Sequence, residues 1–136
     1  MDRPDSVSAP PLPADAVDGA RVVPDFDEPG SKLSRDLVDF YKHIYGRGPA
    51  AVKTLVSAEV AVTVLYAVFN PGEQTLIAGG KLTEVEQMRL RTAEVARPRL
   101  VSLAEEALGR PVVTSVTGIG TREEVATETF FLASDL

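Results

Sequence analysis

The stretch that decides the fold runs from Tyr41 to Leu76 and reads Y-K-H-I-Y-G-R-G-P-A-A-V-K-T-L-V-S-A-E-V-A-V-T-V-L-Y-A-V-F-N-P-G-E-Q-T-L. A helix is expected to end in it at Gly46, because glycine readily adopts the left-handed conformation found after helix C-termini. Pro49 then opposes helical continuation and directs the chain into extended structure. We expect the remaining elements to pack against the hairpin that follows.

This hairpin is predicted to consist of strands at about 51–57 and 59–68, joined by a tight turn near Ser57–Glu59. The second strand alternates between two sets of residues. One set is Val60, Val62, Val64, Tyr66 and Val68, and the other is Ala61, Thr63, Leu65, Ala67 and Phe69. A strand with two apolar faces is typical of a central strand that is covered on both sides. One layer of helices covers only one face, so a second subunit is expected on the other, which predicts a homodimer.

Helices are predicted on both sides of the hairpin. The first runs from about Leu33 to Tyr45, with Ser31 or Ser34 as its N-cap. Its apolar stripe consists of Leu37, Phe40, Tyr41 and Ile44. The second begins at Asn70-Pro71-Gly72-Glu73, which supplies an N-cap, a proline at the first helical position and a glutamate at the third.

Gly79-Gly80 is expected to interrupt this helix, and Thr83 with Glu86 then offers a second capping box. The long helix that follows has an apolar stripe made of Val85, Met88, Thr92, Ala96, Leu100, Leu103 and Ala107. Because the spacing of this stripe is unbroken, we expect the helix to bend near residues 94–97 and to continue past Pro98.

Two final strands are predicted at about 111–117 and 124–132. The order of elements is therefore α-β-β-α-β-β. It indicates an α+β fold of two layers, in which a four-stranded, mostly antiparallel sheet carries the helices on one face.

The charge of the chain is concentrated in its first thirty residues. Residues 1–30 hold seven acids, two arginines and six of the ten prolines, which predicts a disordered acidic leader. Residues 31–136 hold the other thirteen acids and twelve bases, and we predict that they form the folded domain. A domain so close to neutral argues against nucleic-acid binding, which depends on a basic surface.

Composition excludes several other classes of protein. The chain has no cysteine, which excludes disulfides and thiolate catalysis. The N-terminus lacks the basic and then apolar order of a signal peptide. The longest nearly apolar run, Val60 to Phe69, is about half the length of a membrane span. We expect a soluble, cytoplasmic protein whose association with a membrane would depend on a partner.

No catalytic residue, cofactor site or metal site is predicted. His43, the only histidine, has Asp39 four residues before it, but no nucleophile is indicated beside this pair. Neighbouring acids such as Glu105 and Glu106 point in different directions on a helix, so they do not converge on a metal. The basic residues of the long helix are interpreted as a solvated surface; they are Lys81, Arg89, Arg91, Arg97 and Arg99.

Both Gly-x-Gly segments, at 46–48 and 118–120, are interpreted as turns. A phosphate-binding loop lies between a strand and a helix, and neither segment has that context. We make one functional prediction for the turn after the first helix. Arg47, Gly48, Pro49 and Lys53 are predicted to contact a partner or an anion there.

Three segments carry a family resemblance. They read L-V-D-F-Y-K-H-I-Y-G-R-G-P-A-A-V-K-T at 37–54, N-P-G-E-Q-T-L at 70–76 and L-A-E-E-A-L-G-R-P-V-V at 103–113. Together with the hydrophobic hairpin, they resemble the MpsC-type domain, a family described as a component of a sodium-translocating membrane-potential-generating system. The resemblance covers about residues 33–133. It implies an accessory role in membrane bioenergetics, exercised through a membrane-protein partner, and it supplies no catalytic residues.

The expected function is therefore that of a non-enzymatic accessory or regulatory domain which acts by protein–protein contact. Two alternatives stay open. One is a small-molecule-binding protein or enzyme with a pocket at a dimer interface, holding Tyr41, Tyr45, His43 or Tyr66. The other is a nucleic-acid-binding regulator, which rests on analogy of fold alone.

Overall fold

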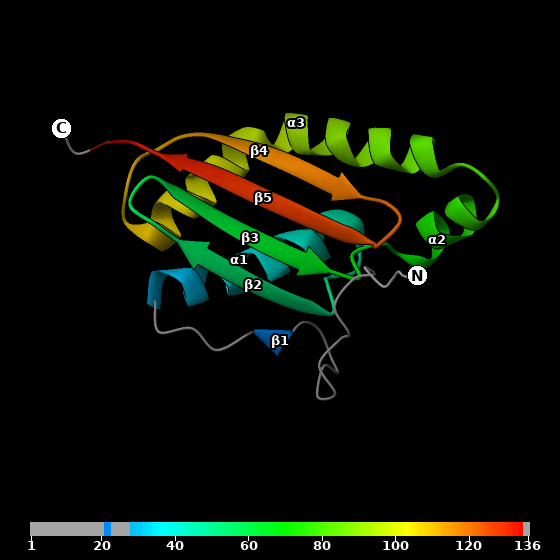
Figure 1. The fold of residues 1–136 in the computed structure, drawn as a ribbon, viewed down its shortest axis with the longest axis horizontal. Helices are drawn as coiled ribbons and strands as arrows, with labels where there is room; N and C mark the ends of the chain where they lie inside the picture. Colours follow the sequence, from blue (N-terminus) through cyan, green and yellow to red (C-terminus); the bar gives the residue numbers. More distant parts are fainter. Residues whose placement is uncertain (1–20, 23–27, 135–136) are drawn as a thin grey trace, which may run out of the picture.

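The structure is a computed structural model, and it describes residues 21–22 and 28–134 (Figure 1). The elements follow in the order β1 (Arg21–Val22), α1 (Glu28–Tyr45), β2 (Ala51–Val56), β3 (Val60–Tyr66), α2 (Pro71–Ala78), α3 (Leu82–Leu108), β4 (Val112–Gly120) and β5 (Val125–Leu132). Apart from the two-residue strand β1, this order confirms the predicted α+β fold, with the second helical segment divided in two.

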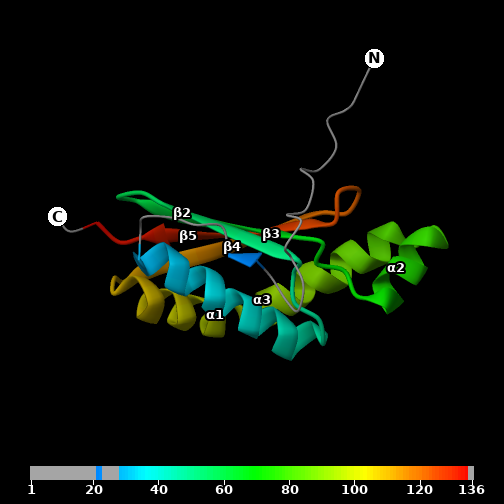
Figure 2. The same ribbon diagram turned by 90° about the horizontal axis from the view of Figure 1, so that it is seen from below.

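The strands form one sheet in the order β1-β2-β3-β5-β4. The four long strands are antiparallel to their neighbours, as predicted, and β1 pairs in parallel with β2. Helices α1 and α3 lie side by side on the same face of this sheet, and α2 extends beyond one end of it (Figure 2). In this strand order β3, the second strand of the hairpin, lies in the middle of the sheet.

Helix α1 begins at Glu28, five residues before the predicted start, so the prediction of Ser31 or Ser34 as N-cap is wrong. Pro29 lies in the first turn, where a proline is tolerated because the first amides of a helix have no partner within it. The helix ends as predicted, and Gly46 follows with a φ of 77°.

The disordered leader predicted for residues 1–30 falls largely on residues 1–20 and 23–27, which lie outside the described part of the chain. Within the described part, β1 and the first three residues of α1 belong to the same segment. The boundary between leader and domain stays a prediction.

Helix α2 begins with the predicted capping box. The Asn70 side chain accepts a hydrogen bond from the Glu73 amide at 2.8 Å, and the Glu73 carboxylate accepts one from the Asn70 amide at 2.9 Å. The second predicted capping box is wrong, because the N-cap of α3 is Lys81 and makes no side-chain cap bond. Helix α3 continues past Pro98 as predicted. Pro98 is exposed, so water can reach the carbonyl group that the proline leaves without its helical partner.

The hydrophobic core lies between the sheet and helices α1 and α3. Its largest buried apolar side chains are Leu33, Leu37, Tyr41, Leu65, Phe69, Leu100 and Phe130. A chain of buried hydroxyl groups crosses the same layer, since Ser34 and Thr54 lie 2.7 Å apart and Thr54 and Thr63 also lie 2.7 Å apart. These bonds satisfy polar groups that would otherwise be costly to bury.

The other face of the sheet carries no helix among the described residues (Figure 2). We call it the open sheet face, and its residues follow from strand alternation and register: Lys53, Leu55, Val60, Val62, Val64, Tyr66, Thr114, Val116, Val125, Thr127, Thr129 and Phe131. Leu55 is 57% exposed and Phe131 is 43% exposed. The second apolar face predicted for β3 is thus part of a larger apolar surface.

Gly109 ends α3 in the left-handed conformation, with a φ of 68° and no neighbouring atom within 4 Å of the position that an added methyl group would occupy. Gly109→Ala is expected to lower the free energy of unfolding by about 1 kcal/mol, because only the backbone conformation is strained. Gly79→Ala is the matched control, since Gly79 has a φ of −90° that alanine adopts freely. Urea unfolding checks both variants, and equal stability of the two would contradict the expectation.

Candidate functional site

The predicted contact residues do not form a single exposed corner. Arg47 is half-buried, and its Nη1 donates a hydrogen bond to the Phe69 carbonyl at 3.0 Å, which ties the end of α1 to the loop before α2. Gly48 lies against the Lys42 side chain, and Pro49 is buried. Lys53 is exposed on the open sheet face. Their contact with a partner or an anion stays a prediction.

A buried ion pair joins the helices beside this turn. Arg89 on α3 is 1% exposed, and it donates two hydrogen bonds to the Glu73 carboxylate, from Nε at 2.7 Å and from Nη2 at 2.6 Å. Nη2 also donates to the Val68 carbonyl at 2.7 Å. Glu73 therefore belongs both to the capping box of α2 and to the ion pair, so α2, α3 and the end of β3 are held at one point.

Aromatic rings enclose this guanidinium group. Its central carbon lies 3.6 Å from the centre of the Tyr45 ring and 5.3 Å from that of Phe69. Rings placed over a cation attract it through their negative faces, and the attraction is larger where water is excluded. Nη1 has no hydrogen-bond partner among the described residues. The Tyr45 ring, itself half-buried, covers the charge at the end of α1.

A second buried acid lies under α1. Glu128 on β5 is 1% exposed and accepts hydrogen bonds from the Tyr41 hydroxyl at 2.8 Å and from the Thr117 hydroxyl at 2.6 Å. Burial raises the pKa of Glu128 from 4.5 to about 7, and these two hydrogen bonds oppose the rise. Burial, followed by the charge of Glu128, raises the pKa of the Tyr41 hydroxyl well above its usual value. At neutral pH the Glu128 carboxyl is therefore partly protonated.

Sequence reasoning placed Arg89 on the solvated surface of the long helix, and this interpretation is wrong. The predicted stripe is right at Val85, which is buried, but wrong at Met88, which is 45% exposed while Arg89 and Ala93 are buried. The signal that identifies the buried side is a series of alanines at helical spacing, formed by Ala93, Ala96, Ala104 and Ala107. Extending that series by one turn toward the N-terminus reaches Arg89.

The burial of Glu128 could have been predicted from strand alternation. On β5 it alternates with Ala126 and Phe130, both of which are fully buried, so a period of two residues places its side chain on the core side of the sheet. The need of a buried carboxylate for donors then points to hydroxyl groups on neighbouring elements, which Tyr41 and Thr117 supply.

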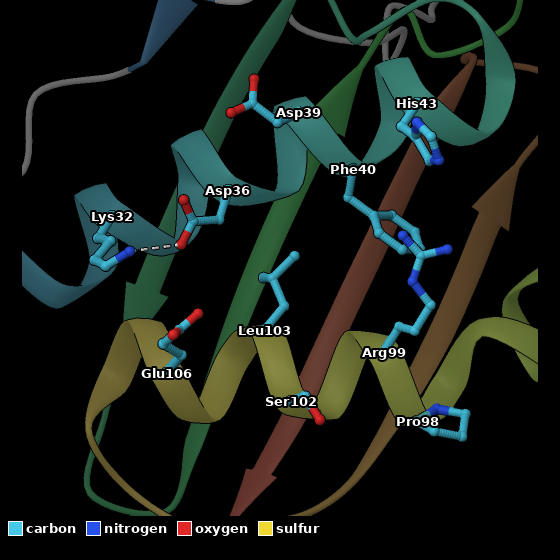
Figure 3. Close-up of a pocket in the computed structure, with 10 residues that line it drawn as sticks. All are labelled: Lys32, Asp36, Asp39, Phe40, His43, Pro98, Arg99, Ser102, Leu103 and Glu106. Carbon is cyan, nitrogen blue, oxygen red and sulfur yellow. Dashed lines mark hydrogen bonds and ion pairs between the residues drawn. The ribbon is translucent and has the colours of Figure 1, made fainter.

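A shallow groove of about 660 Å³ separates α1 from α3 on the outside of the helical layer (Figure 3). Phe40 and Leu103 line its apolar part, and the guanidinium carbon of Arg99 lies 5.3 Å from the centre of the Phe40 ring. Lys32 is paired with Asp36 at 3.0 Å. Asp39, Arg99 and Glu106 also line the groove, so charges of both signs are mixed along it and it presents no strong field of one sign.

His43 and Asp39 border the same groove, with Ser102 across it. Figure 3 shows Ser102 pointing away from His43, and among these described residues no hydrogen bond links the three. Of the aromatic residues that were considered for a pocket, Tyr41 and Tyr45 lie together with ring centroids 5.3 Å apart, whereas Tyr66 lies on the open sheet face. In the described ranges, no group of three potential ligands is placed to hold a metal.

Comparison with known proteins gave one positive finding. The sequence model of a family described as "Na+-translocating membrane potential-generating system (MpsC)" matches residues 28–134. This range includes every long element of the sheet and all three helices of the described chain. Searches of curated proteins and of solved structures found no match. No described helix has the length and hydrophobicity that crossing a membrane requires.

Proposed function

We propose, from the premise that this chain belongs to the MpsC family, that it is a non-enzymatic accessory domain which acts by contact with other proteins. The description of the family supports a setting in a membrane system that translocates sodium ions. In this proposal the domain lies in the cytoplasm and reaches the membrane by binding a protein of that system.

The observation that carries the proposal is the open sheet face. Large apolar surfaces on a folded domain are typical of protein interaction sites. On this face Leu55, Val116 and Phe131 are each more than two-fifths exposed, and the valines of β3 lie between them. Lys53 is its single charged residue. Such a surface favours contact with another apolar protein surface.

Site-specific photo-crosslinking in native cells tests whether this face makes the contact. A photoreactive amino acid at Phe131 is expected to form protein adducts, because the side chain lies in the proposed contact surface. The control position is Val95, which is 83% exposed on α3 at the other side of the domain. Absence of adducts at Phe131, or the same adducts at both positions, would contradict the proposed surface.

Native isolation followed by mass spectrometry tests the bioenergetic setting. A membrane protein of the ion-translocating system is expected to co-purify with the wild-type chain. If the wild-type chain retains no such protein, the proposed accessory role is wrong, whatever the oligomeric state of the domain.

A further inference from the structure

The composition of the open sheet face restricts what can cover it. Its two central strands, β3 and β5, contribute only valine, tyrosine, threonine and phenylalanine to this face. The acid within β5, Glu128, points to the opposite side of the sheet. Lys53 lies on β2, toward one side of the face. A partner therefore needs an apolar surface with almost no net charge.

The acidic N-terminal segment of the chain does not meet this requirement. Residues 1–20 contain Asp2, Asp5, Asp15 and Asp18, against a single arginine. Covering the apolar face with this segment would bring carboxylates toward a surface that offers one cation, and removal of a carboxylate from water without a partner is costly. A second copy of the chain, by contrast, presents the same apolar face and therefore meets this requirement.

The size of the face is also adequate for self-association. Four strands of about seven residues cover roughly 20 Å by 20 Å, since strands lie about 4.8 Å apart and rise about 3.3 Å per residue. Because protruding side chains enlarge the surface, two such faces in contact bury a total accessible area on the order of 1,000 Å². This area is near the lower limit of specific interfaces.

We propose that the open sheet face is the interface of a homodimer, in which two copies stack sheet against sheet. This inference deepens the proposed function, on which it rests, by naming a second copy as the protein that covers the face. Stacked sheets lie about 10 Å apart with their side chains interdigitated. Under two-fold symmetry the same residues serve both copies, and the helical layers face outward on either side.

Sedimentation velocity of the full chain tests the proposal. At about 100 μM, well above a micromolar Kd, the wild-type chain is expected to sediment as a species with twice the 14.5 kDa mass of one copy. Val64→Glu is expected to weaken association at least about 100-fold, because two carboxylates would be buried without partners. Val95→Glu introduces the same charge on α3 and is expected to remain dimeric.

A wild-type monomer at this concentration would overturn the proposal. So would a dimer that Val64→Glu leaves intact, because pairing through an edge strand would then be the mode of association. Far-UV circular dichroism verifies that each variant is folded. If Val64→Glu is unfolded, Thr127→Glu on β5 gives the same test at a position that is already polar and partly exposed.

Cysteine crosslinking provides a second readout, since the chain contains no cysteine of its own. A bifunctional maleimide is expected to join two copies of Val62→Cys and to leave Val95→Cys as single chains. The two proposals can be contradicted independently. A purified monomer that still captures the membrane protein would contradict the homodimer but not the accessory role. A purified dimer that captures no membrane protein would contradict the accessory role but not the homodimer interface.

Discussion

Arg89→Met is expected to lower the free energy of unfolding by about 3–5 kcal/mol, because it leaves the Glu73 carboxylate buried without its cation. Methionine preserves much of the volume that packs against Tyr45 and Phe69, so loss of charge and hydrogen bonds dominates the effect. Urea unfolding followed by circular dichroism measures the change. All variants are compared at one protein concentration, since association of the chain would contribute to the measured stability.

Two controls separate the ion pair from a general effect of removing arginine. Arg91→Met, on the exposed side of α3, is expected to change stability by no more than about 0.5 kcal/mol. Glu73→Gln combined with Arg89→Met is expected to recover much of the loss, because glutamine still forms a capping box and no buried charge remains. A loss for Arg89→Met as small as that for Arg91→Met would show that the ion pair contributes little.

Glu128→Gln is expected to remove a pH dependence of about 3 kcal/mol, which corresponds to a pKa raised from 4.5 to about 7. A raised pKa in the folded state means that folding favours the protonated carboxyl. The stabilising contribution of Glu128 is therefore complete below about pH 4.5 and is lost as the pH rises to about 7. At pH 8 the variant is expected to be more stable than the wild-type chain, whereas at pH 4 the two are expected to be similar.

The measurement is the difference in unfolding free energy between wild type and variant across this pH range. Glu106→Gln is the matched control, because Glu106 is exposed on α3 and the same charge is removed. Parallel profiles for wild type and Glu128→Gln would contradict the assigned pKa. The hydrogen bonds that Tyr41 and Thr117 make to Glu128 are expected to persist in the Glu128→Gln variant, since hydroxyl groups can donate to or accept from the amide of glutamine.

Local patterns predicted much of the fold. Gly46 and the segment from Asn70 to Glu73 determine where α1 ends and where α2 begins, because caps depend on neighbours within a few residues. Strand alternation located β3 and its two apolar faces. The start of α1 was predicted too late, because proline and glycine disfavour helix interiors, and only the position of Pro29 in the first turn makes it compatible with the helix.

The buried charges could not be predicted in the same way. Arg89 is separated from Glu73 by sixteen residues, and Glu128 from Tyr41 by eighty-seven. A charged side chain is ordinarily assigned to the surface, since burial without a partner is unfavourable. That assignment is reversed only when distant segments supply the partner, and periodicity within one helix does not show which segments will meet.

The sequence by itself determined the order and type of the long elements, the cap of α2 and the apolar character of both faces of β3. These properties depend on backbone preferences and on spacing along the chain. The tertiary structure alone decided that α1 and α3 cover the same face, that Arg89 meets Glu73, and that the other face of β3 joins a wide apolar surface. The physical reason is that burial, hydrogen-bond partners and surface area depend on which distant segments pack together.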